Sequence, residues 1–438
     1  MKQETLEKFA GETGNNFKQT EIGLIPEDWE VVRLGEVAKV VRGVSWRKTE
    51  ANKEGKGIPV LTIPNVEKGK INFEFNYFLT KSVSRQKLLN LKDIIFVASS
   101  GSIENVGRNA ILKYLPFERI AFASFLSVLR AETNKIVPEF LYFLINSRWI
   151  DFTKFVKRAA DGKYNFQLRD FERNALIPLP PLPEQRKIAK VLDKIQQAIE
   201  LQDRIIEQAK RLKKSLMQKL FTEGLYGEEQ KKTKIGLIPK SWEVVRLGKI
   251  GIFEYGYTET ALEENTGIKF LRITDIKDDG LILWNEVPYC KISETKLKKY
   301  QLENGDILFA RIGATTGKTC FIESPPKSVF ASYLIRLKIE TDVYKKFVYY
   351  YTQTPIYWSQ VEANKEGKLK KGISATLLRT FKIPLPPLEE QKQIVHILST
   401  IDKKIEVEQK RRQVLKALFK TMLHKLMSGE IRLKEVEI

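Results

Sequence analysis

The sequence predicts an α+β protein built as a tandem duplication. Two globular α/β domains are joined by two long helices, which form an antiparallel coiled coil with internal pseudo-twofold symmetry. Three observations predict this class. A sixteen-residue phrase is repeated half a chain later, each copy contains short strand patterns broken by Pro and Gly, and each copy ends in a long stretch with a one-sided apolar stripe.

The repeated phrase is IGLIPEDWEVVRLGEV at residues 22–37, which returns as IGLIPKSWEVVRLGKI at 235–250 with twelve identical positions. Three further phrases recur in the same order, at offsets that fall from 213 to 206 residues: DIIF (93–96) as DILF (306–309), ASFLSVLR (123–130) as ASYLIRLK (331–338), and IPLPPLPEQRKIAKVLDKI (177–195) as IPLPPLEEQKQIVHILSTI (383–401). Ordered matches at this spacing indicate two copies of one unit of about 210 residues. They exclude a solenoid, whose repeats span about 20–50 residues.

Each copy contains the same elements in the same order. The repeated phrase predicts a short Val-rich strand introduced by Pro and Trp, and short strands and turns follow it. An aromatic-rich helix is predicted next, over 138–156 in the first copy and 344–361 in the second, and a basic loop containing Gly comes after it. The IPLPP motif then ends the domain, because adjacent prolines fix φ and remove backbone donors.

The two closing helices have the clearest periodicity, with apolar residues at alternating steps of three and four. Each helix spans about 38 residues, or roughly 57 Å, and a stripe of this length predicts a partner helix. The simplest partner is the other copy, although two separate helices, each packed on its own domain, are an alternative. The predicted interface contains Ile188, Val191, Ile195, Ile205, Leu212, Leu216, Ile394, Ile397, Ile401, Leu415, Leu418 and Met422. Only Gln202 breaks the first stripe.

These boundaries divide the chain into five segments. We expect an N-terminal tail at 1–20, a first domain at 21–183, a long helix at 184–226, a second domain at 227–388, and a second long helix with the C-terminal tail at 389–438.

The composition favours a nucleic-acid partner. The chain has 75 basic and 54 acidic residues, a formal charge of +21. This excess serves solubility at least, but lysines and arginines that neutralise phosphates also drive binding to a polyanion. The two cysteines, Cys290 and Cys320, fit a reducing compartment. With no signal-like N-terminus and no apolar run of about 20 residues, we expect a soluble, cytoplasmic protein.

The motifs that resemble catalytic sites are incomplete, so the sequence predicts a binding protein. In GATTGKT (313–319), three residues separate the glycines, whereas a phosphate-binding loop needs four. In SPPK (324–327), Lys327 replaces the aromatic residue of the amino-methyltransferase tetrapeptide. The only histidines, His396 and His424, both lie on the second long helix and do not complete a zinc site or a Ser/His/Asp set. We therefore expect no catalytic residue and no metal site.

The repeated frame resembles the specificity subunit of type I restriction–modification enzymes. The resemblance lies in IGLIPxxWEVVRLG, a variable stretch of about 150 residues, IPLPPLxEQxxI and a long helix, all present twice from about Thr20 to Glu430. It implies that the variable segments are target recognition domains, each reading half of a split DNA sequence. It also implies that the helices set the distance between the half-sites and dock two methyltransferase subunits, with nuclease/translocase subunits joining for restriction. This chain would hold no cofactor, while S-adenosylmethionine, Mg and ATP would be bound by the partner subunits.

Candidate DNA-contacting residues follow from their chemistry, because the family's base-reading residues change with the target. Arg and Lys read guanine, Asn and Gln read adenine, and aromatic rings next to basic residues pack on sugar or base. The first domain offers Trp46, Arg47, Lys48, Ser99, Ser100, Lys163, Asn165 and Gln167. The second offers Tyr255, Tyr257, Arg311, Thr315, Thr316, Lys318, Lys368, Lys370 and Lys371.

Three alternatives stay open at this stage. A specificity subunit of another restriction type would pair with one combined methyltransferase–nuclease. A fused DNA-modifying enzyme would need a catalytic motif, and a coiled-coil adaptor would not need two large variable domains.

Overall fold

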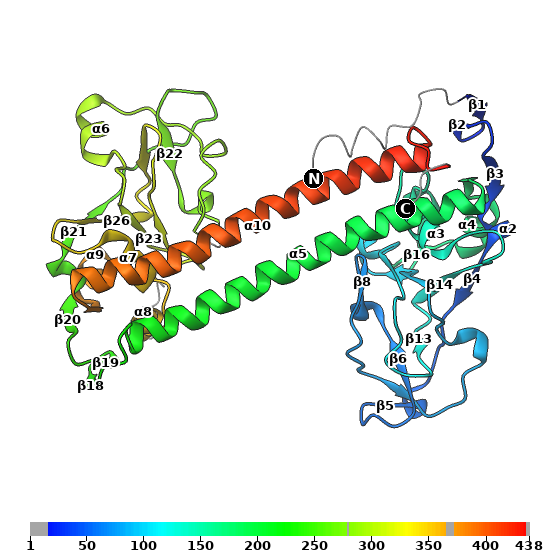
Figure 1. Ribbon diagram of the computed structural model, residues 1–438, viewed down its shortest axis with the longest axis horizontal. Helices are drawn as coiled ribbons and strands as arrows, with labels where there is room; N and C mark the ends of the chain where they lie inside the picture. The colour runs from blue at the N-terminus through cyan, green and yellow to red at the C-terminus, as the bar shows by residue number, and fades with distance from the viewer. Residues whose placement is uncertain (1–15, 278–279, 365–371, 435–438) are drawn as a thin grey trace. The chain divides into compact units, whose positions relative to one another are not determined.

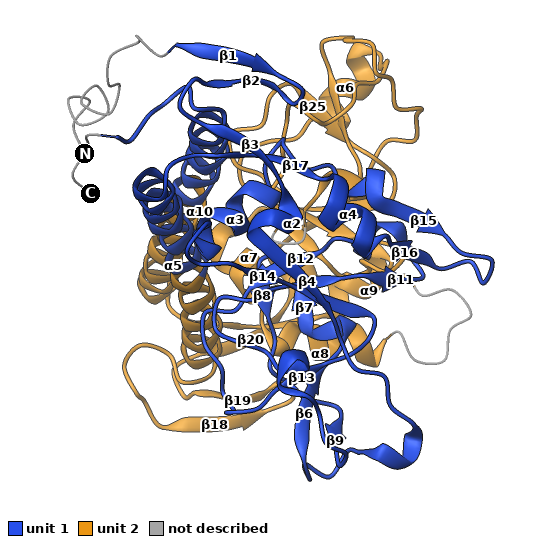
Figure 2. Cartoon of the chain, turned by 90° about the vertical axis from the view of Figure 1, so that its right-hand side faces the viewer, with its two compact units in different colours: residues 1–203, 411–438 blue, residues 204–410 orange. Residues whose placement is uncertain are grey.

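The computed structural model describes residues 16–277, 280–364 and 372–434 (Figure 1). The chain divides into two compact units (Figure 2). Unit 1 contains residues 1–203 and 411–438, and unit 2 contains residues 204–410. Each unit therefore combines one copy of the repeated domain with parts of both long helices, so the unit boundary falls inside the helices and not at their ends.

Unit 1 is built on small sheets that pack around three buried apolar clusters. Its main antiparallel sheet has the order β12 (Asn109–Ile111), β10 (Ile94–Val97), β14 (Leu126–Ala131), β4 (Ala38–Arg42). A second sheet has the order β13 (Ala121–Phe122), β6 (Ile58–Leu61), β9 (Phe78–Leu79), β5 (Ala51–Asn52), and a third has β11 (Ser99–Ser100), β16 (Tyr164–Phe166), β15 (Val156–Arg158). Two-stranded pairs join β1 (Phe17–Thr20) to β2 (Gly23–Pro26), β3 (Glu30–Arg33) to β17 (Leu176–Leu179), and β7 (Val66–Glu67) to β8 (Lys70–Ile71). The first described strand, β1, begins at Phe17, inside the segment predicted as a tail.

Unit 2 repeats this plan. Its main sheet has the order β21 (Gly251–Tyr255), β26 (Leu334–Ile339), β23 (Ile307–Ala310), β24 (Thr319–Phe321). The pairs are β18 (Gln230–Thr233) with β19 (Gly236–Pro239), β20 (Glu243–Arg246) with β27 (Lys382–Leu385), and β22 (Lys269–Leu271) with β25 (Ser328–Phe330). The parallel pairs β6–β13 and β22–β25 occupy equivalent places in the two units.

Short helices complete each unit, and the aromatic helices are shorter than predicted. Unit 1 has α2 (Leu34–Val37), α3 (Pro138–Ile145) and α4 (Leu168–Asn174), and unit 2 has α6 (Glu294–Tyr300), α7 (Lys345–Tyr351), α8 (Pro355–Ala363) and α9 (Ala375–Thr380). The aromatic helix of the first copy ends at Ile145, and that of the second is divided between α7 and α8. Pro355 begins α8 because proline is favoured in the first turn of a helix.

The long helices α5 (Leu182–Thr222) and α10 (Leu388–Ser428) have 41 residues each. Their segments run antiparallel within each unit. In unit 1, Arg432, just past the end of α10, pairs with Glu184 at 2.7 Å, and Arg412 pairs with Asp203 at 2.9 Å. In unit 2, Lys213 pairs with Asp402 at 2.6 Å, and the N–H of Leu225, just past α5, bonds Glu390 at 2.9 Å. As residue numbers increase along α5, the residue numbers of their partners on α10 decrease, so the two helices are antiparallel within each unit.

The buried face of α5 is centred one residue beyond the predicted stripe. Ile188 and Ile394 are fully buried, and nine of the other predicted interface residues are half-buried. Leu212 was wrongly predicted, because 54% of it is exposed, whereas Leu192, Ile199, Ile206 and Leu220, which widen the predicted stripe, are buried. A straight α-helix drifts by about 20° per heptad against a 3.5-residue seam. Leu212, more than three heptads after Ile188, has therefore rotated off the buried face.

A frame of side-chain hydrogen bonds fixes each long helix to its domain. In unit 1, Gln185 accepts a bond from the Val137 N–H at 2.8 Å and donates to the Pro180 carbonyl at 2.8 Å. In unit 2, Gln391 accepts from the Tyr344 N–H at 2.9 Å and donates to Pro386 at 2.8 Å. The repeated Glu-Gln pair therefore satisfies backbone groups where the helix leaves the domain.

Each unit also buries one aspartate at the start of its central strand, paired with an arginine from the neighbouring strand. Asp93 is held by Arg130 at 2.6 Å, whereas Asp306 is held by Arg336 at 3.4 Å. The strand register aligns Leu129 with Leu337, so the two arginines come from different positions of the repeat. Arg336 also pairs with Glu254.

Candidate nucleic-acid interface

The structure brings Ser99, Ser100 and Asn165 of unit 1 together at one sheet edge. β11 pairs with β16 in the register Ser99 with Asn165, and the Ser99 hydroxyl donates to Asn165 Oδ1 at 2.6 Å. Ser99 is only 7% exposed, so its predicted contact with DNA is corrected by burial, and its hydroxyl instead orients the Asn165 amide. Gln167 lies beside them and donates to the Asn165 carbonyl at 3.3 Å. Residues from two distant parts of the sequence thus form one polar strip, which we call the β11–β16 edge.

A basic hairpin extends this edge. The turn between β15 and β16 is closed by the Ala159 N–H, which donates to the Lys163 carbonyl at 2.7 Å, and Gly162 adopts a φ of +82° that favours glycine. Lys163 is exposed and pairs with Asp161 at 2.9 Å, which holds the pKa of that carboxyl below its usual value. Arg158 lies 5.8 Å from the Tyr164 ring. The hairpin therefore presents cations to solvent beside the amide and hydroxyls of the edge.

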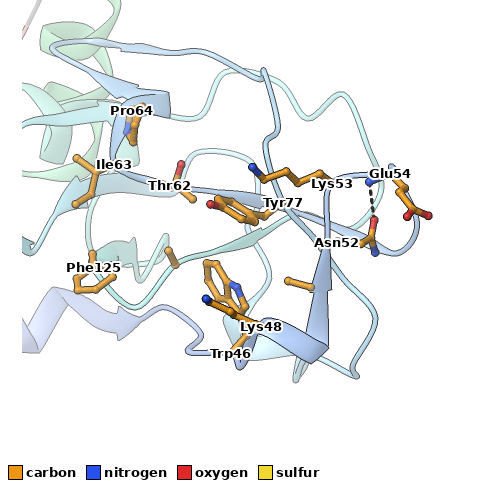
Figure 3. A pocket seen from close by; sticks show the side chains of 12 residues that line it. Trp46, Lys48, Asn52, Lys53, Glu54, Thr62, Ile63, Pro64, Tyr77 and Phe125 are labelled. Atoms are coloured by element: carbon orange, nitrogen blue, oxygen red, sulfur yellow. Dashed lines mark hydrogen bonds between the residues drawn. The ribbon is translucent and has the colours of Figure 1, made fainter.

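Trp46 and Lys48 line a separate hollow of about 780 Å³ in unit 1 (Figure 3). The Trp46 and Tyr77 rings lie 6.0 Å apart with a tilt of 51°, and Lys53 Nζ lies 5.8 Å from the Tyr77 centroid. Arg47 stands just outside. Its backbone N–H bonds Glu50 at 2.8 Å and, together with Lys81, lowers the pKa of that carboxyl. We call this cavity the Trp46 hollow.

Phe125 connects the Trp46 hollow to the β11–β16 edge, and it was not among the DNA-contacting residues predicted from the sequence. Its side chain is 47% exposed and lines the hollow, while its carbonyl accepts the N–H groups of Ala98 and Ser99 at 2.8 and 3.1 Å. The signal in the sequence was the recurrence of an aromatic residue at this position of the repeated phrase, as Phe125 in ASFLSVLR and Tyr333 in ASYLIRLK.

Unit 2 has the equivalent edge. Tyr333, which aligns with Phe125, is 56% exposed, and its carbonyl accepts the Arg311 N–H at 2.9 Å. The Arg311 guanidinium lies 5.0 Å from the ring of Tyr255, whose hydroxyl accepts the Ala375 N–H at 3.0 Å. The predicted residues Arg311 and Tyr255 are thus in contact. Tyr333, which is bonded to Arg311, was not among the predicted residues. A bridge between Ile312 and Gly372 takes the place of the β11–β16 pairing.

The remaining predictions for unit 2 divide into three groups. Thr315 and Lys318 lie in the turn between β23 and β24, where Lys318 Nζ donates to the Ile276 carbonyl at 3.5 Å. Lys368, Lys370 and Lys371 lie outside the described residues. Two predictions are corrected by burial: Thr316 is 1% exposed and donates to the Gly313 carbonyl at 2.7 Å, and Tyr257 is 8% exposed inside an apolar cluster.

The structure offers few sites for other chemistry. Gly313 and Gly317 close a turn between the antiparallel strands β23 and β24, whereas a phosphate-binding loop leads into a helix. Within residues 16–277, 280–364 and 372–434, no group of three or more His, Cys, Asp or Glu is placed to hold a metal ion. In the same part of the chain, no helix is both long and apolar enough to cross a bilayer.

The long helices carry a second candidate surface. Apolar side chains are exposed on both helices in each unit: Leu201 and Val414 in unit 1, and Leu212 and Val407 in unit 2. Leu201 is on α5 and Val414 on α10, and Val414 is 68% exposed. Exposed apolar residues that recur on helices otherwise covered by charge are typical of a surface that binds another protein.

Comparison with known proteins gives one consistent result. The family described as Type I restriction modification DNA specificity domain matches the chain twice, over residues 26–211 and 239–417. A protein of Methanocaldococcus jannaschii assigned as the MjaX type I restriction enzyme specificity subunit is 32% identical over 430 residues, which is 96% of this chain and 97% of that protein. The EcoKI specificity subunit of Escherichia coli K12 is 25% identical, covering 85% of this chain and 82% of its own.

A solved structure has the same fold. The type I restriction–modification S subunit from M. genitalium superposes with a TM-score of 0.59 at 16% sequence identity, covering 95% of this chain and 98% of its own.

Proposed function

The chain belongs to the type I restriction–modification DNA specificity family, and we propose how its two units divide the reading of a DNA target. It is a specificity subunit with two recognition domains, and such subunits recognise DNA without catalysing the reaction. Residues 21–183 form the first recognition domain and residues 227–388 the second. Each domain reads one half of a split sequence.

The observation that carries this proposal is the repeated position of Phe125 and Tyr333. In both units an exposed aromatic residue sits on the same turn, and its carbonyl accepts a backbone N–H from the strand that holds the predicted polar residues. The side chains at equivalent positions around this turn differ: Ser99 and Asn165 of unit 1 correspond to Ile312 and Gly372 of unit 2, and Ala98 corresponds to Arg311. A constant platform with variable side chains is what two readers of unrelated half-sites require.

The chemistry of each edge suggests what it reads. Asn165 Oδ1 already accepts the Ser99 hydroxyl, so its Nδ2 is the atom that would donate to a base edge. An Asn side chain pairs best with adenine, and Arg311 best with guanine. The basic hairpin with Lys157, Arg158 and Lys163 would contact phosphates, which position the duplex and make the affinity fall with salt.

The long helices are the proposed docking platform. Two methyltransferase subunits would bind there, one at Leu201 and Val414 and one at Leu212 and Val407, because each unit exposes one such pair. Nuclease/translocase subunits would join this assembly. S-adenosylmethionine, Mg and ATP would be bound by the partners and not by this chain. Cys290 and Cys320 are buried, unpaired thiols, which supports a reducing, cytoplasmic location.

A domain exchange tests the proposal. Residues 38–176 are replaced as one block by the equivalent segment of a relative, and both chains are used in a binding selection over random duplexes at fixed salt. We expect a bipartite motif in which only one half changes. A contiguous motif, or a change in both halves, would rule out one reader per half-site. Replacing Leu201 and Val414 by Asp tests docking separately, since it is expected to weaken methyltransferase binding without altering the motif.

A further inference from the structure

We propose that the Trp46 hollow binds one unstacked nucleobase of the DNA that unit 1 reads. The inference rests on the proposed function and deepens it. A hollow of about 780 Å³ falls within the range of about 300–1,000 Å³ that small-molecule ligands occupy. In the view of Figure 3, Trp46 and Tyr77 lie on one side of the hollow and Phe125 on the other.

Trp46 and Tyr77 are not part of the repeated framework, since unit 2 builds the same framework without aromatic residues at these two positions. Parallel bridges place Val44 beside Ala123 and Tyr257 beside Ala331, so Trp46 aligns with Glu259. The Tyr77 carbonyl accepts the Val60 N–H, and the Pro288 carbonyl accepts the Phe270 N–H from the equivalent strand, so Tyr77 aligns with Pro288. Two aromatic residues are thus present in unit 1 where the second copy has a carboxylate and a proline.

These rings present faces and not only edges. A tilt of 51° at 6.0 Å means that Trp46 and Tyr77 form a corner and do not stack on each other. Tyr77 is 36% exposed and Phe125 is 47% exposed, so both rings leave aromatic surface open to the hollow. Lys48 and Lys53 line the same hollow, and Glu54, the carboxylate among its described lining residues, is paired with Lys56 at 2.9 Å. Aromatic faces beside cations match a base together with its phosphate.

The location of the hollow indicates where the base comes from. Phe125 lines the hollow, and its carbonyl is bonded to Ala98 and Ser99 of the β11–β16 edge. DNA read at that edge would therefore place a nucleotide next to the hollow. A base inside a duplex has its faces covered by its neighbours, so only a base turned out of the stack can use these rings.

Mismatched duplexes test this directly. Once the binding selection has identified the target, a single mismatch is placed at each position in turn, and the affinity of the full chain is measured at fixed salt. A protein that turns out a base binds a mispaired position more tightly, because the pair is already weakened. We expect a rise of about tenfold at one position in or beside the half-site of unit 1. A flat profile would overturn the inference.

Variants then assign the effect to the hollow through the ratio of mismatched to matched affinity. Trp46→Ala and Tyr77→Ala are expected to bring the ratio to about one, whereas Tyr333→Ala in unit 2 is expected to keep it, whatever its overall affinity. Trp46 also contacts the apolar cluster beneath it, so Tyr77→Ala carries the test if Trp46→Ala does not fold. An unchanged ratio in Tyr77→Ala would place the turned-out base elsewhere and contradict the proposal.

Free nucleotides are the other source of the same chemistry. Titration with dAMP and dTMP, followed by tryptophan fluorescence and compared with Trp46→Phe, distinguishes the two. Saturation by mononucleotides together with a flat mismatch profile would overturn the assignment to a base of bound DNA. Failure of the chain to select any bipartite target would instead remove the proposed function, so the two failures are distinguishable.

Discussion

The indole N–H of Trp29 donates to Glu184 Oε2 at 3.1 Å, and its counterpart Trp242 donates to Glu390 Oε2 at 2.9 Å. Both bonds are buried and join the two repeated phrases of one copy, one at the start of the domain and one at the start of the long helix. This is why the frame recurs almost unchanged. A buried carboxylate needs its donors, so Trp and Glu are retained together while the side chains of the reading edges diverge.

The two bonds predict unequal costs for the same substitution. In unit 1, Arg432 also holds Glu184, at 2.7 Å, whereas the other described contact of Glu390 is the Leu225 N–H at 2.9 Å. Removing one partner of a buried group costs about 1–3 kcal/mol. We expect the loss in unfolding free energy to lie near the low end of this range for Trp29→Phe and near the high end for Trp242→Phe. The measurement is urea unfolding followed by circular dichroism. Both variants lose the same ring volume, so equal costs would show that Arg432 does not compensate for the lost bond to Glu184.

The C-terminal segment of unit 1 is predicted to loosen in acid. Arg432 and Lys434 hold the pKa of Asp28 well below its usual value of about 3.9. Above about pH 4, ionised Asp28 therefore stabilises the folded state. This stabilisation is lost as the pH falls below about 4 toward the lowered pKa of Asp28. The pair is partly exposed, so the contribution is about 0.5–1 kcal/mol.

Asp28→Ser provides a matched control, because the second copy has Ser241 at this position, bonded to Glu228 at 2.9 Å. The variant is expected to lose this part of the acid sensitivity, measured as unfolding free energy between pH 5 and 2. An unchanged pH profile would mean that Asp28 is not the responsible group.

Thiol reactivity is predicted to report the opening of unit 2. Cys290 and Cys320 are both fully buried and both lie in unit 2, and burial raises the pKa of Cys290 to about 11 and that of Cys320 to about 12. Because the thiolate is the reactive species, a disulfide reagent at pH 8 is expected to label neither residue in the native chain and both in urea. Leu212→Cys, at an exposed position, supplies the reactive control. Rapid labelling of the unmodified native chain would contradict the buried placement.

The long helices are predicted to set the spacer between the half-sites. Four residues inserted after Gln202 add about 6 Å and roughly 40° of rotation. One base pair of a duplex with about 10 per turn rotates by about 35°. We therefore expect the preferred spacer to lengthen by about one base pair while both half-sites stay the same, as read by selection over random DNA. Substituting Glu207, Gln208, Arg211 and Lys214 by Ala keeps the helix length and serves as the control. An unchanged spacer after the insertion would show that the helices do not measure it.

The sequence predicted the duplication and both long helices because repeated phrases and apolar stripes are local patterns. It centred the stripe on the wrong side of α5 at Leu212, because the face that a long helix buries depends on its true pitch and on the domain that covers it. It chose Ser99 and Asn165 separately, but their pairing across β11 and β16 is a tertiary contact that spacing along the chain does not reveal. Phe125 and Tyr333 were missed because the strands around them are apolar and buried.

The shifted arginines have a consequence for how such subunits recombine. Asp93 depends on Arg130, but Asp306 depends on Arg336, which aligns with Val128 of the first copy. Asp93 and Asp306 occupy equivalent positions, so a hybrid that joins β10 to β26, or β23 to β14, still places an arginine on the strand beside its buried aspartate. Exchange of strands between the two copies therefore keeps this buried ion pair and changes only the position from which the arginine reaches the aspartate.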